Sequence, residues 1–182
     1  MKTFAVLLVL LALTGCASWQ NKACSSYITA TSLVTVAEQT AKPSCDAGNL
    51  PADKCGQLKT IYGNIYQGAM TAGNTLKLAF YVTDKTQLAS MLANYQASLT
   101  QIQTLVQDYI NLYNSILKER KGAPLKGVIS PALLQVIIQA FVALMGQIPG
   151  LMNALGTWQL TTVDIAALVA QINTAQAALP VW

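Results

Sequence analysis

Cysteines are the side chains in this chain that are best placed to do chemistry. The sequence contains four cysteines, seven acidic residues and no histidine. Without histidine, the commonest general base of enzymes is absent. No two carboxylates are three or four residues apart, which is the spacing that brings side chains together on a helix. The acidic residues are Glu38, Asp46, Asp53, Asp84, Asp108, Glu119 and Asp164. We therefore expect a protein that is not an enzyme and uses no cofactor and no metal.

Cys16 follows a segment that is typical of export signals. A lysine near the N-terminus precedes an uninterrupted apolar run over residues 4–13, and small residues lead to the cysteine in Leu13-Thr14-Gly15-Cys16. The run is far shorter than the roughly 20 residues that a bilayer-spanning helix needs, which argues against a transmembrane anchor. A basic start, an apolar middle and small residues at the end characterise a cleaved signal peptide. This segment resembles the lipobox of bacterial or phage-encoded lipoproteins.

The resemblance covers residues 1–17 and carries specific implications. It implies that residues 1–15 are removed and that Cys16 becomes the new N-terminus, modified with a diacylglycerol thioether and an N-linked acyl chain. Two or more acyl chains anchor a protein stably in a membrane. In a Gram-negative host, Ala17 rather than aspartate after the cysteine implies sorting to the outer membrane. The expected location is therefore the outer membrane, lipid-anchored and facing the periplasm.

Three further cysteines remain in a compartment that would be oxidising. Cys24 lies early in a predicted helix, on the order of 25 Å from its far end, whereas Cys45 and Cys55 flank the loop beyond that end. Because bridged residues need Cα atoms within about 7 Å, we expect a Cys45–Cys55 disulfide. Cys24 is then expected to be a buried thiol, with intermolecular pairing as the alternative.

Apolar residues recur with a helical period throughout the chain after Cys16, and no segment alternates as a strand would. The sequence predicts a single all-α domain over residues 16–182, a bundle of about five helices. The first helix covers Lys22 to Ala41 and is ended by Pro43. The other four start near Pro51, Asp84, Ser130-Pro131 and Thr162. The second contains Gly56, Gly63, Gly68 and Gly73, each of which costs about 0.8 to 1 kcal/mol relative to alanine, and tight approach by a neighbouring helix would be one reason to keep them.

The third predicted helix has the most regular pattern. Asp84 is placed to cap it, with Gln87 completing a capping box. Its apolar positions then step alternately by four and three residues, which is the heptad pattern of a helix that packs along its length against another. These positions are Leu88, Leu92, Tyr95, Leu99, Ile102, Val106, Tyr109, Tyr113 and Ile116. The short link to the second helix predicts a long antiparallel, heptad-packed hairpin.

No charged residue occurs between Lys126 and Asp164. Apolar side chains cover nearly the whole circumference of the helix predicted there, apart from a thin stripe at Gln135 and Gln139. Such a helix is either central in a bundle or in contact with lipid, and both interpretations of residues 127–156 stay open. The side chains expected to form a membrane or partner surface are Ile138, Phe141, Leu144 and Met145.

Composition limits the partners. Charged residues make up 10% of the chain and the net charge is +4, without a basic stripe that would favour nucleic acid. The sequence therefore predicts a lipid-anchored, non-catalytic binding or structural module that meets a protein partner of unknown identity. The alternative is a membrane-active or phage-type lipoprotein that blocks an envelope component or acts in superinfection exclusion or lysis through residues 127–156.

Overall fold

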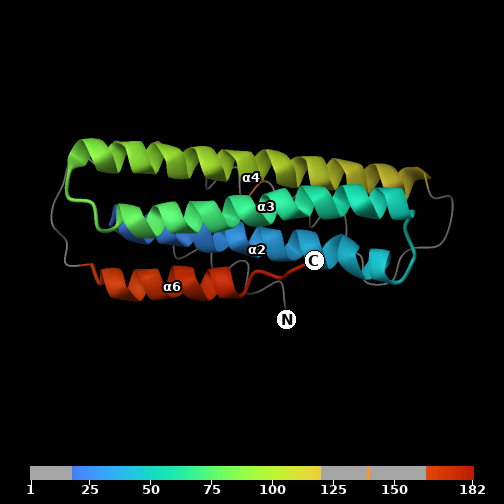
Figure 1. Ribbon diagram of the computed structural model, residues 1–182, viewed down its shortest axis with the longest axis horizontal. Helices are drawn as coiled ribbons and strands as arrows, with labels where there is room; N and C mark the ends of the chain where they lie inside the picture. Colours follow the sequence, from blue (N-terminus) through green and yellow to red (C-terminus); the bar gives the residue numbers. More distant parts are fainter. Residues whose placement is uncertain (1–17, 120–138, 140–162) are drawn as a thin grey trace.

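The computed structural model describes residues 18–119, 139 and 163–182 (Figure 1). Within these ranges the chain is mostly helical and contains no strand. The segments 1–15 and 127–138, and the remainder of the uncharged segment after Gln139, lie outside the described residues, as does Cys16. The described helices are α2 (Trp19–Asp46), α3 (Ala52–Ala79), α4 (Lys85–Glu119) and α6 (Ile165–Ala177).

The described helices form an elongated bundle around the pair α2 and α3. These two helices contact each other, and α4 and α6 each contact both of them. Figure 1 shows α4 and α6 on opposite sides of this central pair. Helices α2, α4 and α6 run in the same direction, and α3 alone runs the opposite way. The core is therefore shared by all four described helices and is centred on α2 and α3.

The first helix extends further than the sequence predicted, because Pro43 lies inside it and does not end it. Proline removes one backbone donor and normally breaks a helix, yet α2 continues for one more turn. Its end is set by Gly48, which has a φ of 65°. The Gly48 N–H donates to the Cys45 carbonyl over 2.9 Å, and the Asn49 N–H donates to the Ser44 carbonyl over 2.8 Å. This pair of bonds is a Schellman motif, which terminates helices at a left-handed glycine.

Helices α3 and α4 form the most extensive contact between described helices. Every position of the apolar pattern predicted for α4 is buried, from Leu88 through Leu99 to Ile116. The Asp84 carboxylate accepts a hydrogen bond from the Gln87 N–H over 2.8 Å, which satisfies a free donor at the helix start. The predicted start and buried face of this helix are therefore confirmed.

The glycines of α3 fulfil the expectation of close packing at two positions. A Cβ atom on Gly68 would lie 3.1 Å from the Ile102 side chain of α4. At Gly73, it would lie 2.6 Å from the Tyr27 hydroxyl and 2.7 Å from the Gln176 amide nitrogen. Gly56 and Gly63 have no described neighbour within 4 Å of such an atom, so tight packing does not explain them.

Tyrosine hydroxyls connect the helices through the core. Tyr27 of α2 donates to the Ala69 carbonyl of α3 over 3.0 Å. Tyr95 of α4 donates to the Ala23 carbonyl of α2 over 3.0 Å. Tyr62 of α3 donates to the Pro180 carbonyl over 2.6 Å, which fixes the chain segment after α6 against α3. These bonds fix the axial positions of the helices because each hydroxyl can reach one carbonyl only in the observed register.

Candidate functional site

The predicted site residues fall into two groups. Cys45 and Cys55 belong to the described residues and come together at one end of the bundle. The residues outside the described part are the proposed lipidation site and the proposed membrane or partner surface, namely Cys16, Ile138, Phe141, Leu144 and Met145. Gln139, predicted to lie on the polar stripe of the same segment, is helical and exposed.

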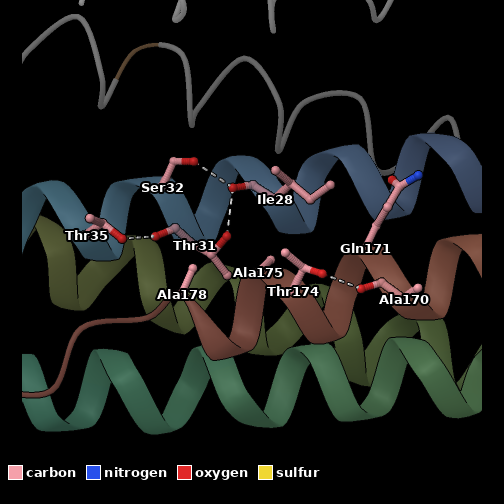
Figure 2. A pocket seen from close by; sticks show the side chains of 9 residues that line it. All are labelled: Ile28, Thr31, Ser32, Thr35, Ala170, Gln171, Thr174, Ala175 and Ala178. Carbon is pink, nitrogen blue, oxygen red and sulfur yellow. Dashed lines mark hydrogen bonds between the residues drawn. The ribbon is translucent and has the colours of Figure 1, made fainter.

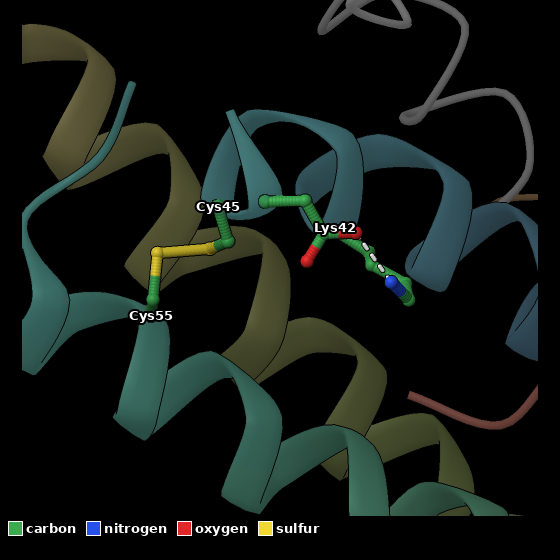
Figure 3. The surroundings of a disulfide bond; sticks show 4 residues. Lys42, Cys45 and Cys55 are labelled. Atoms are coloured by element: carbon green, nitrogen blue, oxygen red, sulfur yellow. Dashed lines mark hydrogen bonds and ion pairs between the residues drawn. A yellow bond between two sulfur atoms is a disulfide. The ribbon is translucent and has the colours of Figure 1, made fainter. Parts of the chain in front are cut away.

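Cys45 and Cys55 form the predicted disulfide, with Cα atoms 5.7 Å apart (Figure 3). Cys45 lies in the last turn of α2 and Cys55 in the first turn of α3. The bond therefore closes the connection between these helices covalently. Beside it, Lys42 forms an ion pair with Asp46 one turn further along α2. This pair bridges the turn that contains Pro43, where a backbone donor is missing.

The described surface has a groove of about 470 Å³ between α2 and α6 (Figure 2). Its walls come from two helices that run in the same direction, with residues 28–35 of α2 on one side and, on the other, residues 170–177 of α6 and its C-cap Ala178. The lining side chains are small or apolar apart from one amide, and none carries a charge. They are Ile28, Thr31, Ser32, Thr35, Ala170, Gln171, Thr174, Ala175 and Ala178. We call this surface the α2–α6 groove.

The hydroxyls of the groove are engaged with the backbone of their own helices. Thr31 and Ser32 both donate to the Ile28 carbonyl, over 2.8 Å and 2.9 Å. Thr35 donates to the Thr31 carbonyl over 3.2 Å, and Thr174 donates to the Ala170 carbonyl over 2.9 Å. Figure 2 shows these bonds directed along the helices. A hydroxyl that is satisfied in this way adds little polarity to a surface, so the groove presents mainly carbon atoms.

Sequence reasoning missed this groove, although a signal for it exists. Ile28, Thr31 and Thr35 follow one another at three- and four-residue spacing, which places them on one face of α2. That face adjoins the core face occupied by Tyr27, Val34 and Ala41, and the buried Thr31 lies where the two meet.

Cys24 is a buried free thiol beside the groove, as the sequence predicted. Its sulfur lies 3.8 Å from the Leu168 carbonyl and 3.6 Å from the Gln171 side-chain oxygen, so both oxygens are within reach of its single S–H donor. Burial raises the pKa of Cys24 to about 11 because the buried environment disfavours the thiolate. The reactive form is scarce at neutral pH, so this cysteine packs α2 against α6 and is a poor nucleophile.

Gln176 fixes α6 against α3 and was not predicted as a core residue. Its amide nitrogen donates to the Met70 carbonyl over 3.1 Å and to the Asn74 side chain over 3.2 Å. Its oxygen accepts a hydrogen bond from the Lys77 ammonium over 2.7 Å. The position lies four residues after Ile172 on the apolar face, and that spacing was the available signal. A buried amide with these partners costs little and selects one register of α6.

Other kinds of site find no support in the described part of the chain. No three His, Cys, Asp or Glu side chains there gather closely enough to hold a metal ion. None of the described helices combines the length and the apolar character needed to cross a bilayer. Comparison with known proteins finds no matching family model, no similar curated protein and no similar solved structure. Function therefore has to be argued from this chain alone.

Proposed function

We propose that this protein is a lipid-anchored lipoprotein of the outer membrane that faces the periplasm. Its helical domain, over residues 16–182, acts as a non-catalytic binding or structural module for a protein partner. The lipobox-like run Leu13-Thr14-Gly15-Cys16 supports the anchor. The Cys45–Cys55 disulfide is consistent with an oxidising compartment.

One observation carries the proposal, namely where the helical bundle begins relative to Cys16. Helix α2 starts at Trp19, and the Ser18 hydroxyl caps it by accepting a hydrogen bond from the Asn21 N–H over 3.3 Å. Ala17 alone separates the proposed lipidated cysteine from this cap. A signal segment and a folded domain thus meet with almost no linker, as expected if the bundle is held directly at a membrane surface.

We also propose the finer architecture that the sequence pattern favours. The chain after the signal peptide is a bundle of about five helices, and residues 127–156 contribute the fifth. Helices α3 and α4 pack as a heptad hairpin along the nine heptad positions of α4, all of which are buried. A helical bundle of this kind presents long helix faces to a partner, which suits a binding or structural role without catalysis.

A second candidate is a membrane-active or phage-type lipoprotein that blocks an envelope component through residues 127–156. The observation that favours it is the absence of charge between Lys126 and Asp164. The two candidates share the anchor at Cys16 and differ in whether the uncharged segment contacts lipid or protein.

Replacement of Cys16 tests the anchor. The Cys16→Ala variant is expected to accumulate as unprocessed or soluble protein, whereas the parent chain fractionates with the outer membrane. Metabolic labelling with a palmitate analogue is expected to modify the parent and leave the variant unmodified. The matched control is Cys24→Ala, which should keep both processing and labelling. Continued cleavage before residue 16 together with membrane retention of Cys16→Ala would contradict the proposal.

A further inference from the structure

We infer that the connection between α3 and α4 is a second membrane contact of the anchored protein, in which Leu78 and Tyr81 enter the interface between lipid headgroups and acyl chains. We call residues 78–82 the α3–α4 turn. The inference deepens the proposed function and rests on it, because the lipid on Cys16 is what holds this end of the bundle at a membrane.

The first argument concerns the position of the α3–α4 turn relative to the start of α2. Figure 1 shows both at the same end of the bundle. Trp19 of α2 packs against Phe80 of the turn, with ring centroids 5.7 Å apart. Cys16 precedes the cap residue Ser18 by two positions, so their Cα atoms are at most about 8 Å apart. An anchor at Cys16 therefore holds the α3–α4 turn close to the membrane surface.

The second argument concerns apolar side chains that the bundle leaves uncovered. Among the described residues, the large hydrophobic side chains that are exposed are Leu78, Tyr81 and Val181. Two of these three belong to the α3–α4 turn, where Leu78 is 60% exposed and Tyr81 is 67% exposed. Removing such side chains from water is favourable. At this end of the bundle, the membrane that holds the anchor is the nearest apolar phase.

The backbone of the turn places the two exposed side chains on one side. The Tyr81 N–H donates to the Leu78 carbonyl over 3.1 Å, and the Val82 N–H donates to the Ala79 carbonyl over 3.3 Å. Such bonds between residues three apart define a 3₁₀ turn, in which side chains three positions apart eclipse each other. Leu78 and Tyr81 therefore project together, whereas Phe80 is buried against Trp19.

The chemistry of this pair suits the membrane interface. Tyrosine joins an apolar ring to a hydroxyl and is enriched at the level of the headgroups, and the Leu78 side chain adds apolar area beside it. The charges at this end do not oppose the contact, because both carboxylates there cap helices and the lysines favour anionic headgroups. The charged residues described at this end are Lys22, Lys77, Asp84, Lys85 and Asp164.

A contact through the α3–α4 turn gives the bundle an orientation. The exposed face of α4 carries Asn94, Gln101 and Asp108, and covering these polar groups with lipid would cost free energy. Contact at the end of the bundle leaves this face in water. The bundle then projects from the membrane, with the long faces of its described helices directed toward the periplasm and open to a protein partner.

Fluorescence quenching by membrane lipids tests the inference on the full-length, lipidated chain. A Cys24→Ala background carries the fluorophore NBD on a cysteine introduced at Thr83, beside the α3–α4 turn. The matched control carries it at Gln57, an exposed position about 30 Å away along α3. The vesicles contain phosphatidylethanolamine, phosphatidylglycerol and a lipid with a nitroxide on its headgroup. Quenching is expected to be at least about twofold stronger at position 83, since interfacial contacts reach only a few ångströms into the membrane.

A double variant separates the contact from the anchor. Leu78→Ser/Tyr81→Ser is expected to lower quenching at position 83 to the level seen at position 57, while the protein stays bound to vesicles through its lipid. Val181→Ser, which removes the third exposed side chain, is the matched control and should leave quenching unchanged, because the adjacent Trp182 packs on Tyr62, away from this end.

The outcomes distinguish the two proposals. Equal quenching at positions 83 and 57, or quenching at position 83 that survives the double variant, would overturn the inference. Labelling of the same preparations with a palmitate analogue reports on the anchor separately. A labelled, vesicle-bound chain without excess quenching at position 83 would overturn this inference alone, whereas an unlabelled chain would overturn the anchor and the inference that rests on it.

Discussion

Among the described glycines, Gly73 has the least space for a side chain, because α2, α3 and α6 meet there. The Tyr27 hydroxyl and the Gln176 amide occupy the space that a side chain at this position would need. Both groups already donate hydrogen bonds. The Tyr27 hydroxyl donates to the Ala69 carbonyl, and the Gln176 amide donates to the Met70 carbonyl. Tyr27 cannot move without losing a buried hydrogen bond, and Gln176 cannot move without losing a part-buried one.

Replacing Gly73 with alanine is therefore expected to destabilise the fold, although alanine is the better helix former. Overpacking should lower the free energy of unfolding by about 1 to 3 kcal/mol. Gly63→Ala is the matched control on the same helix, and it should raise stability by up to about 1 kcal/mol because nothing described lies near its Cβ position. Urea unfolding of both variants measures the difference. A stabilised Gly73→Ala protein would mean that α2 and α6 approach α3 less closely than described.

At the scale of single helices, periodicity predicted most of the described secondary structure. The pattern from Leu88 to Ile116 identified the buried face of α4 because every fourth or third residue is apolar. The prediction was wrong at Pro43, since local proline chemistry was given more weight than the Schellman signal at Gly48. Periodicity identifies a buried face but not its neighbour, so the parallel pairing of α2 with α6 could not be predicted. The same limit applies to the candidate site, because a groove exists only once both walls are placed.

Leu99 is the centre of the buried face of α4 and is 1% exposed. Leu99→Ala is expected to lower the free energy of unfolding by roughly 2 to 5 kcal/mol, because the lost side chain leaves a cavity between helices. Gln101→Ala, at an exposed position on the same helix, is expected to change stability little. Thermal denaturation distinguishes them, and similar effects at the two positions would show that the heptad interpretation of α4 is incorrect.

The Cys45–Cys55 bond joins α2 to α3 across a separation of 10 residues. Its removal in a Cys45→Ser/Cys55→Ser double variant is expected to cost at most about 3 kcal/mol, because a short loop loses little entropy on closure. Peptide mapping without reductant is expected to recover this pair and a free Cys24. A Cys24–Cys55 link would contradict the described end of α2. Comparison of unfolding midpoints with and without reductant gives the same stability difference in the parent chain.

At the scale of the whole molecule, the two functional candidates differ in what covers the uncharged segment. A large exposed apolar surface has to be hidden by protein or by lipid. If protein covers the segment, the domain is expected to be attached to the membrane only through its lipid and the α3–α4 turn. Of the two glutamines predicted for the polar stripe of the segment, Gln139 is described and is exposed.

A chain consisting of residues 18–182 is therefore expected to be monodisperse without detergent and to leave lipid vesicles intact. The measurement is release of an entrapped dye at low protein concentration. A membrane-active domain of the same length would instead release dye, and Ile138→Asp would abolish that release because a charge in hydrocarbon is costly. Such an outcome would favour the envelope-blocking candidate over the structural module.

The contact between Cys24 and Leu168 joins residues that are 144 positions apart in the chain. Contacts of such long sequence separation form late, whereas the neighbouring helices α3 and α4 can associate early. In a chain that is synthesised from its N-terminus, α2 is made before α6, and the Cys24 thiol stays uncovered by Leu168 during that interval. All three cysteines after Cys16 are then available at once, although only one pairing is native. Packing of α6 against α2 therefore also removes Cys24 from thiol exchange. Formation of the correct disulfide then depends on how quickly α6 packs.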